Sequence, residues 1–442
     1  MKKITAEEIV KMAMDKGSDS AEVYMKSSRG ISAEAKDGGV EALEVSEDRG
    51  ISLKVVRNKR VGFAFTTDPD DIGKMVDEAV QAAEWTGVDE FMDIPELVTS
   101  EDVLIFDEKI KNIKEDDVIK DALLLEETAV SFDQRIKKVR KAEAVAGTAR
   151  TTIVNSKGVN VTYESSYYSA YLTALAEDGK GDSQMGWDYA GSRRLSDIDV
   201  KLVGEEAAKR AMELLGSRKI SAVKAPVILS PSVAGEFLDI LSSSISAEAV
   251  QKQRSFLAGK AGQKIMSPLV EIIDDGRMGW HIGTRPVDDE GVPTKTKTII
   301  SEGVLNGYIH NTYTAKKNGT VSTGNAVRGG FKGLPGVGVT NFYIKPSEAG
   351  SADSLVKSLS KGIVVLGAMG VHTANPVSGD FSIGISGLWV ENGEVAYPVK
   401  EAIISGNVLE LFRKVEAVGN DLKFYGSTGS PSLLIGDMDI SA

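Results

Sequence analysis

Apolar and polar positions follow two different periods along the first 87 residues, one helical and one typical of strands. Thr5 and Glu8 have the spacing of a capping box, and the apolar stripe after them ends at Gly17, which predicts an N-terminal helix. Residues 21–69 consist of short runs of alternating or β-branched side chains bounded by Gly, Asn or Asp, which predicts about five antiparallel strands. Helical periodicity returns over residues 70–86, so the pattern predicts a helix, a sheet and a second helix.

A second alternation of helix and sheet follows a connector without periodicity at residues 88–110. We expect a helix over 114–131, then long strands with a hairpin turn at Asn155–Gly158. A further helix is predicted at about 197–216. The two alternations resemble each other in pattern, but no residue-level repeat links them.

Glycine becomes dense in the second half of the chain, which holds most of the 45 glycines. The stretch "APVILSPSVAGEFLDILSSS" at its start predicts a strand followed by a helix. Farther on, glycines alternate with β-branched and aromatic residues, a composition typical of sheets with bulges, tight turns and close backbone contacts. We therefore expect a C-terminal α+β domain built on a large curved antiparallel sheet.

The predicted fold class is α+β, and the length of 442 residues is sufficient for two or three domains. We expect an N-terminal domain at 1–222, with possible sub-units at 1–87 and 114–216, and a C-terminal domain at 224–442. Hydrophobic residues make up 42% and charged residues 26%, which is normal for a globular chain and argues against extensive disorder.

The net charge of −12 argues against nucleic acid as a partner, because proteins that bind it need clustered Lys and Arg to displace counterions. The basic runs "VRNKR" and "RIKKVRK" are short and interrupted by apolar residues. No run approaches the roughly 18 apolar residues needed to cross a membrane, and "MKKITAEEIVKMAMDKG" lacks the apolar core of a signal peptide. We expect a cytoplasmic protein with no nucleic-acid or membrane partner.

Standard catalytic signatures are absent or incomplete. The chain has no cysteine, which excludes disulfides, thiolate nucleophiles and cysteine-containing metal sites within it. Gly324 and Gly329 have P-loop spacing, but Gly330 and Phe331 occupy the positions of the Lys and Ser/Thr that would contact phosphates. Glycines of a sheet are therefore the favoured interpretation of this stretch.

Ser242, Ser243 and Ser244 raise the question of a nucleophile, but they follow apolar residues inside a predicted helix. No G-x-S-x-G motif occurs in the chain. No two of the histidines are one helical turn apart, as a helical zinc site requires, and turn or sheet-edge positions are favoured for all three. A hydrolase that uses His281 or His372 with a distant serine stays open as an alternative.

Two long stretches of the second half resemble the TldD/TldE family, also called PmbA. They are "RPVDDEGVPTKTKTIISEGVLNGYIHNTYTAKKNGTVSTGNA" and "VSGDFSIGISGLWVENGEVAYPVKEAIISGNVLELFRKVEAVGNDL". The N-terminal "DRGISLKVVRNKRVGFAFTTD" and the "VNSKGV" turn are similar to the same family. The family has been described as modulators of DNA gyrase and as a two-subunit zinc protease.

The resemblance places this chain with the metal-free subunit of that family. The TldD-type subunit carries His-Glu-x-x-x-His on the helix after an "ILSPSVAG"-like sequence, and a cysteine near the C-terminus is the third zinc ligand. Asp239, Ile240 and Ser244 occupy the positions of the first histidine, the glutamate and the second histidine. The resemblance thus implies no cofactor in this chain, a TldE/PmbA-type subunit that is inactive alone, and zinc only in a TldD-type partner.

In the family the two subunits form a heterodimer that degrades unfolded peptides or trims leader peptides. A metal-free subunit can contribute by completing a closed chamber, by binding extended peptide or by stabilising its partner. A glycine-rich sheet suits the second of these roles, because it can supply free backbone groups. Two motifs are candidate peptide-binding residues, with turn chemistry as the equal alternative: Asp288, Asp289, Glu290, Gly291, Thr323, Gly324 and Asn325. The alternative function is a stand-alone binding protein, possible as a homodimer, that modulates DNA gyrase or a toxin–antitoxin system without proteolysis.

Overall fold

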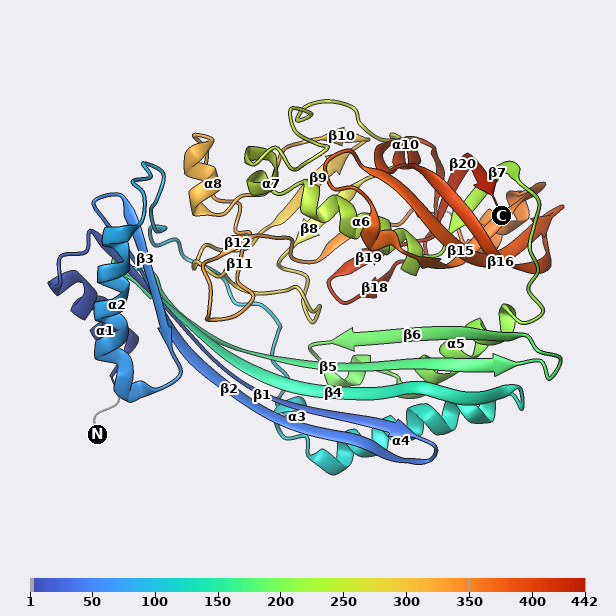
Figure 1. The fold of residues 1–442 in the computed structure, drawn as a ribbon, viewed down its shortest axis with the longest axis horizontal. Coiled ribbons are helices and arrows are strands. Elements are labelled where there is room, and N and C mark those ends of the chain that lie inside the picture. Colours follow the sequence, from blue (N-terminus) through green and yellow to red (C-terminus); the bar gives the residue numbers. More distant parts are fainter. Residues whose placement is uncertain (1–3, 349, 442) are drawn as a thin grey trace.

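The structure is a computed structural model that describes residues 4–348 and 350–441 (Figure 1). Its first half contains five α-helices, six strands and two 3₁₀ turns within these described residues. In chain order they are α1 (Ala6–Asp15), β1 (Ser20–Lys36), β2 (Gly39–Arg57), β3 (Arg60–Thr66), η1 (Pro69–Asp71), α2 (Ile72–Trp85), α3 (Glu108–Lys111), α4 (Glu115–Phe132), β4 (Ile136–Asn155), β5 (Asn160–Glu177), β6 (Ser183–Ser192), η2 (Leu195–Asp197) and α5 (Val200–Glu213).

The predicted helices of the first half are confirmed, and their ends follow local chemistry. Thr5 Oγ1 accepts a hydrogen bond from the Glu8 amide while the Glu8 carboxylate accepts one from the Thr5 amide, which is the predicted capping box. The predicted hairpin turn is also present, because the Asn155 side chain accepts from the amides of Lys157 and Val159 between β4 and β5.

All six strands form one antiparallel sheet, in the order β3-β2-β1-β4-β5-β6. The strands β1, β2, β4 and β5 are 17 to 20 residues long and curve beneath the C-terminal elements, with α3 and α4 on the opposite side (Figure 1). One hydrophobic cluster packs α1 and α2 on one end of the sheet, and a second packs α4 and α5 on the other.

The expectation of about five short strands in residues 21–69 is wrong, since this segment forms three strands of which two are long. Gly30 and Gly50 lie inside β1 and β2 and do not end them. Gly30 pairs with Gly147 of β4, and the ring of Tyr167 covers that position. Gly50 leaves the space that Phe331 of the C-terminal half occupies, because a Cβ there would be 2.2 Å from its ring.

The second half begins with the predicted strand and helix and continues as a mixture of short strands and helices. Its elements are β7 (Val223–Leu229), α6 (Pro231–Ser244), α7 (Ala247–Gln251), β8 (Ile272–Asp275), β9 (Thr296–Ser301), β10 (Val304–Leu305), α8 (Thr312–Lys317), β11 (Ala326–Val327), β12 (Gly336–Val337), β13 (Phe342–Ile344), α9 (Ala352–Ser358), β14 (Lys361–Met369), η3 (Val371–Thr373), β15 (Asp380–Glu391), β16 (Glu394–Asn407), α10 (Val408–Arg413), β17 (Val415–Val418), β18 (Lys423–Tyr425), β19 (Thr428–Ser430) and β20 (Leu433–Ser441).

The expected single antiparallel sheet is corrected to two six-stranded mixed sheets and a two-stranded one. The first six-stranded sheet has the order β10-β9-β8-β13-β19-β18, in which β13 and β19 are parallel. The second has the order β16-β15-β14-β7-β20-β17, in which β7 and β14 are parallel. Strand β16 also pairs with β20, so five strands of the second sheet close into a mixed barrel.

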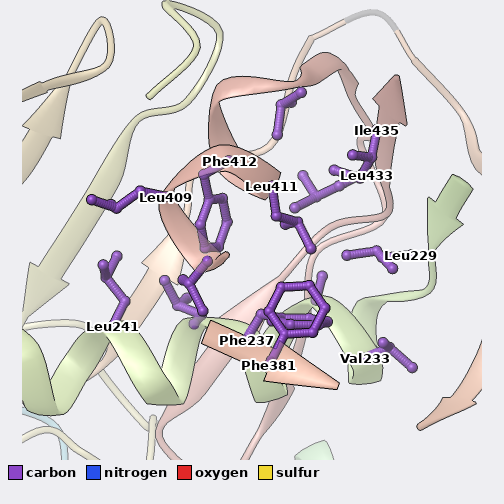
Figure 2. Packing of buried hydrophobic residues seen from close by; sticks show 14 of the residues in the cluster. Leu229, Val233, Phe237, Leu241, Phe381, Leu409, Leu411, Phe412, Leu433 and Ile435 are labelled. Atoms are coloured by element: carbon purple, nitrogen blue, oxygen red, sulfur yellow. The ribbon is translucent and has the colours of Figure 1, made fainter. Parts of the chain in front are cut away.

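Helix α6 is anchored in the largest hydrophobic cluster of the second half (Figure 2). Phe237 of α6 packs edge-on against Phe381 of β15, with ring centroids 4.9 Å apart. Side chains of β7, α10 and β20 complete the cluster, among them Leu229, Phe412 and Leu433. Because this packing fixes the apolar face of α6, the polar residues Glu236 and Asp239 on the helix are held next to β19.

The helices are short for the size of the chain. The longest described helix, α4, has 18 residues and begins with three consecutive acidic residues. Within residues 4–348 and 350–441, no helix combines the length and the apolar composition that crossing a membrane would require.

Candidate functional site

The polar face of α6 meets the C-terminal segment of the chain. Asp239 accepts a hydrogen bond from the Thr428 hydroxyl of β19, with 2.5 Å between Oδ1 and Oγ1. Glu236 lies one turn before Asp239. Burial raises the pKa of Glu236 to about 7, and the charge of Asp239 adds to the rise. Burial also raises the pKa of Asp239, although the Thr428 hydrogen bond opposes this.

The three consecutive serines of α6 bond to their own helix. Ser242 donates to the Asp239 carbonyl at 2.7 Å, Ser243 to the Ile240 carbonyl at 2.9 Å and Ser244 to the same carbonyl at 3.4 Å. Such bonds to the preceding turn are common for serines within helices. None of these three bonds involves a histidine, so the arrangement does not support a serine nucleophile.

The first predicted motif, Asp288 to Gly291, forms a buried turn. Asp288 accepts hydrogen bonds from the amides of Glu290, Val292 and Ala326, each at 2.9 Å. Burial and the neighbouring Glu290 carboxylate raise the pKa of Asp288 to about 7, while these amide bonds lower it. Gly291 has a φ of +87°, and a Cβ there would be 2.5 Å from the Val159 side chain.

The second motif, Thr323 to Asn325, lies directly beside the first. The Thr323 hydroxyl bonds to Asn325 Oδ1 at 2.7 Å, and Asn325 Nδ2 donates to Asp274 Oδ2 and the Gly338 carbonyl at 2.8 Å each. Gly324 has a φ of +74° and approaches the Pro293 carbonyl closely. The bond from the Ala326 amide to Asp288 joins the two motifs into one polar cluster.

Buried ion pairs connect this cluster to the N-terminal sheet. Glu290 Oε1 lies 3.4 Å from Lys54 Nζ of β2, and both side chains are at least 94% buried. Arg328 Nη2 donates to Glu22 Oε1 of β1 at 2.5 Å, and its backbone amide donates to Asp289. Asp288, Glu290 and Asn325 are fully or almost fully buried, so their observed contacts are those of a framework between the two halves. Whether any of the seven predicted residues contacts a peptide stays a prediction.

A polar pocket of about 290 Å³ lies next to this framework, between the N-terminal sheet and the C-terminal loops. Asp289 is the one residue of the two predicted motifs that lines it among the described residues. Its other walls include Lys26, Tyr163, Arg193 and Arg285, none of which the sequence analysis singled out. Arg285 lies three residues before Asp288 in the sequence. Its closeness to the first motif is the only feature of the sequence that could have indicated it.

Comparison with sequence families covers almost the whole chain. Residues 222–442 match the family described as the PmbA/TldA metallopeptidase C-terminal domain. Residues 108–215 match the central domain of the same metallopeptidases, and residues 21–83 match their domain 1. The chain belongs to the PmbA/TldD metallopeptidase family.

Several curated relatives in the PmbA/TldD family are similar along nearly their full length. Metalloprotease PmbA of Escherichia coli O157:H7 is 30% identical, with 98% of this chain and 96% of the relative covered. The Metalloprotease PmbA homolog of Buchnera aphidicola is also 30% identical, with 96% and 93% covered. The Metalloprotease TldD homolog of Haemophilus influenzae is 25% identical, with 91% and 86% covered.

Solved structures that are similar to this chain have the same fold. A Thermotoga maritima protein, named as a candidate modulator of a DNA gyrase, superposes with a TM-score of 0.92 at 28% identity and covers 98% of this chain and 99% of its own. TldE from Thermococcus kodakarensis superposes with a TM-score of 0.89 at 23% identity, with 99% of each chain covered, which shows the shared fold.

The positions Asp239, Ile240 and Ser244 of α6 do not provide the donor atoms that a zinc site requires. Ile240 carries no donor atom, the Ser244 hydroxyl bonds to its own helix, and Asp239 is bonded to Thr428. In the part of the chain that the structure describes, no three His, Cys, Asp or Glu side chains are grouped as a metal site requires. The hydrogen bond between Asp239 and Thr428 joins α6 to the C-terminal segment of the chain.

The three histidines occupy unrelated settings in this PmbA/TldD fold. The His281 ring packs against Phe424 with centroids 4.6 Å apart, and burial lowers its pKa. Burial also lowers the pKa of His310, whose Nδ1 is enclosed without a hydrogen-bond partner among the described residues. His372 is exposed in η3. None of them contacts the α6 serines through a hydrogen bond.

Proposed function

We propose that this chain is the metal-free subunit of a TldD/TldE-type zinc peptidase complex, in which a TldD-type partner supplies the zinc. The observation that supports the proposal is the chemistry of α6 in this PmbA/TldD-family chain: Asp239, Ile240 and Ser244, at the positions that the resemblance assigns to the zinc motif, offer no imidazole, and Asp239 and Ser244 are engaged in hydrogen bonds. A zinc peptidase needs three protein ligands and an activated water, and this helix supplies no imidazole. Catalysis is therefore assigned to the partner.

The proposed contribution of the chain is to bind extended peptide and complete the chamber in which the partner cleaves it. Binding through backbone groups is nearly independent of sequence, which suits unfolded peptides and leader peptides as substrates. Within the described part of the chain, the edge strands β3 and β6 of the N-terminal sheet have a neighbouring strand on one side only, so they offer backbone groups of this kind (Figure 1). We place the complex in the cytoplasm and retain the division into domains 1–222 and 224–442 as part of this proposal.

The test is reconstitution from two separately purified full-length subunits. The chain alone should contain far less than one zinc per molecule and cleave no unfolded casein. Activity should appear when a TldD-type subunit is added, co-elute with a heterodimer in size-exclusion chromatography, and be abolished by o-phenanthroline. Cleavage by the chain alone that is insensitive to the chelator would contradict the proposal and favour a serine hydrolase using His281 or His372.

A second candidate function is a stand-alone binding protein without proteolysis. The observation in its favour is the naming of the Thermotoga maritima structure as a candidate modulator of a DNA gyrase. This candidate predicts a homodimer that shows no association with a TldD-type subunit at micromolar concentration. Analytical ultracentrifugation of the chain, alone and with the partner, separates the two functions.

A further inference from the structure

One wall of the pocket beside Asp289 is a row of side chains across three strands of the N-terminal sheet. Lys26 of β1 is directly opposite Thr151 of β4, and Thr151 is directly opposite Tyr163 of β5. Residues that are paired in this way point to the same face of a sheet. The opposite wall comes from C-terminal loops that carry Arg285 and Asp289. The pocket therefore lies at the interface between the two halves of the chain, and ligand sites are frequent at such interfaces.

Arg193 lines this pocket as a partly buried cation that forms no ion pair with a carboxylate among the described residues. Its guanidinium donates to three neutral acceptors, the backbone carbonyls of Ser166, His281 and Ile282. A guanidinium has five N–H donors, so two remain available. Burial lowers the pKa of Arg193 to about 10, and the nearby charge of Arg285 contributes to the lowering. The group is still charged at neutral pH, and a charge that is partly withdrawn from water without a counter-ion is unfavourable.

Arg285 adds a second incompletely bonded guanidinium. Its Nη1 lies 3.2 Å from Asp289 Oδ2, while its Nε is buried without a partner in the described residues. Asp289 cannot fully compensate the positive charges of Arg193 and Arg285. Its Oδ2, which lies next to Arg285, also accepts a hydrogen bond from the Arg328 amide.

The other acidic groups near Arg285 are already engaged. Asp288 is bonded by three backbone amides, and Asp274 is bonded by Thr340, Asn325 and Lys297.

Two other residues that line the pocket, Lys26 and Tyr163, carry further hydrogen-bond donors. Lys26 forms no ion pair within the described part of the chain. Burial raises the pKa of Tyr163 to about 12, so its hydroxyl keeps its proton at neutral pH. In a chain of net charge −12, this pocket therefore concentrates positive charge and unused N–H groups. It also lies close to the α6 site, because Ser427 lines it and the next residue, Thr428, bonds Asp239.

We propose that this pocket binds a carboxylate group of a peptide, with Arg193, Arg285 and Lys26 as its cationic contacts. That the ligand is a peptide rests on the proposed function, whereas the carboxylate is inferred from the pocket itself. Planar guanidinium groups match the two oxygens of a carboxylate. The volume of about 290 Å³ is at the small end of ligand pockets and fits one or two residues of an extended chain.

The first test measures binding of short peptides to the isolated full-length chain by isothermal titration calorimetry. The probes are an N-acetylated tetra-alanine with a free C-terminus, its C-terminal amide, and the amide with one alanine replaced by glutamate. We expect the free acid to bind at least tenfold more tightly than the plain amide. Binding of the glutamate peptide at the level of the free acid would assign the carboxylate to a side chain. Equal binding of the free acid and the plain amide would overturn the proposal.

The second test uses variants, with thermal unfolding to verify that each is folded. Lys26→Met removes one charge and no observed ion pair, and it should weaken binding of the free acid several-fold without affecting the amide. Arg193→Met should abolish the difference between acid and amide. The matched control is Arg194→Met, because Arg194 is adjacent, exposed and paired with Asp197. If Lys26→Met binds the free acid as wild type does, Lys26 is not a contact and the proposed site is wrong.

The outcome is independent of the peptidase assay, because neither zinc nor a partner subunit is present in the titration. A chain that activates a TldD-type partner but does not distinguish acid from amide would retain the proposed function and lose this site. A chain that binds the free acid but activates no partner would retain the site and lose the proposed function.

Discussion

At the scale of single residues, Glu236 and Asp239 make the stability of α6 depend on pH. The pKa of Glu236 is raised to about 7, so the folded state binds this proton more tightly than the unfolded chain does. Stability is then lost as the pH rises from about 4.5 through 7. Glu236→Gln cannot ionise and should therefore raise the free energy of unfolding at pH 8 by about 1 kcal/mol after allowing for partial exposure, with little change near pH 4, as measured by urea denaturation.

The control for this prediction is Glu127→Gln, because Glu127 is exposed on α4 and forms no ion pair in the described residues. Its stability should follow that of the wild type at both pH values. If the Glu236 variant and the wild type lose stability in parallel between pH 5 and 8, the Glu236 carboxyl does not titrate in this range.

The residues of the site were only partly accessible to sequence reasoning. Asp288 and Asn325 stand in recognisable motifs, and the structure brings them into one cluster. Lys26, Tyr163 and Arg193 carry no motif, because they come together only through strand register and through packing of the two halves. The sequence "GSRRLSD" gives no indication that the first of its two arginines, Arg193, lines a pocket while the second is exposed.

At the scale of elements, the contact between α2 and β3 depends on a missing side chain at Gly62. A Cβ at this position would lie 1.9 Å from the Ala79 carbonyl oxygen of α2. Gly62→Ala should therefore push α2 from the sheet and lower the free energy of unfolding by about 1–3 kcal/mol, as measured by urea denaturation. Gly73→Ala is the matched control, since Gly73 lies in α2 with open space around it. That control should stabilise by about 0.5–1 kcal/mol, and equal effects of both variants would contradict the proposed packing.

Helices were easier to predict than strand lengths, for a physical reason that Gly50 illustrates. Helix ends are fixed by local caps such as that formed by Thr5 and Glu8, which lie three residues apart. Gly50 has the appearance of a strand end, yet the strand continues because Phe331, far away in sequence, fills the space above it. The parallel pairing of β7 with β14 is likewise set by contacts between residues far apart, such as Val227 and Ile363.

At the scale of the whole molecule, the Arg328–Glu22 ion pair holds the two halves together. Both side chains are at most 1% exposed, and Arg328 also lies over the Tyr24 ring. Arg328→Leu would leave the Glu22 carboxylate buried without this partner and should lower the free energy of unfolding by about 3–5 kcal/mol. The measurement is urea denaturation of the full chain, followed by tryptophan fluorescence.

Two comparisons make this prediction specific. Adding Glu22→Gln to Arg328→Leu should recover part of the loss, because the uncompensated charge is then removed. Arg150→Leu breaks the exposed pair with Glu164 and should change stability by less than about 1 kcal/mol. A loss of similar size in Arg150→Leu and Arg328→Leu would show that burial of the pair is not the cause.

The long strand β1 also sets an order of events during synthesis of the chain. Its hairpin partner β2 follows at once, but β4, which pairs with Glu22 to Ala35, is made roughly 100 residues later, or about 5–20 s at ordinary ribosome speeds. Throughout that interval one edge of β1 lacks its neighbour and can pair with other chains. The nascent protein is therefore most in need of a chaperone after the hairpin has emerged and before β4 leaves the ribosome.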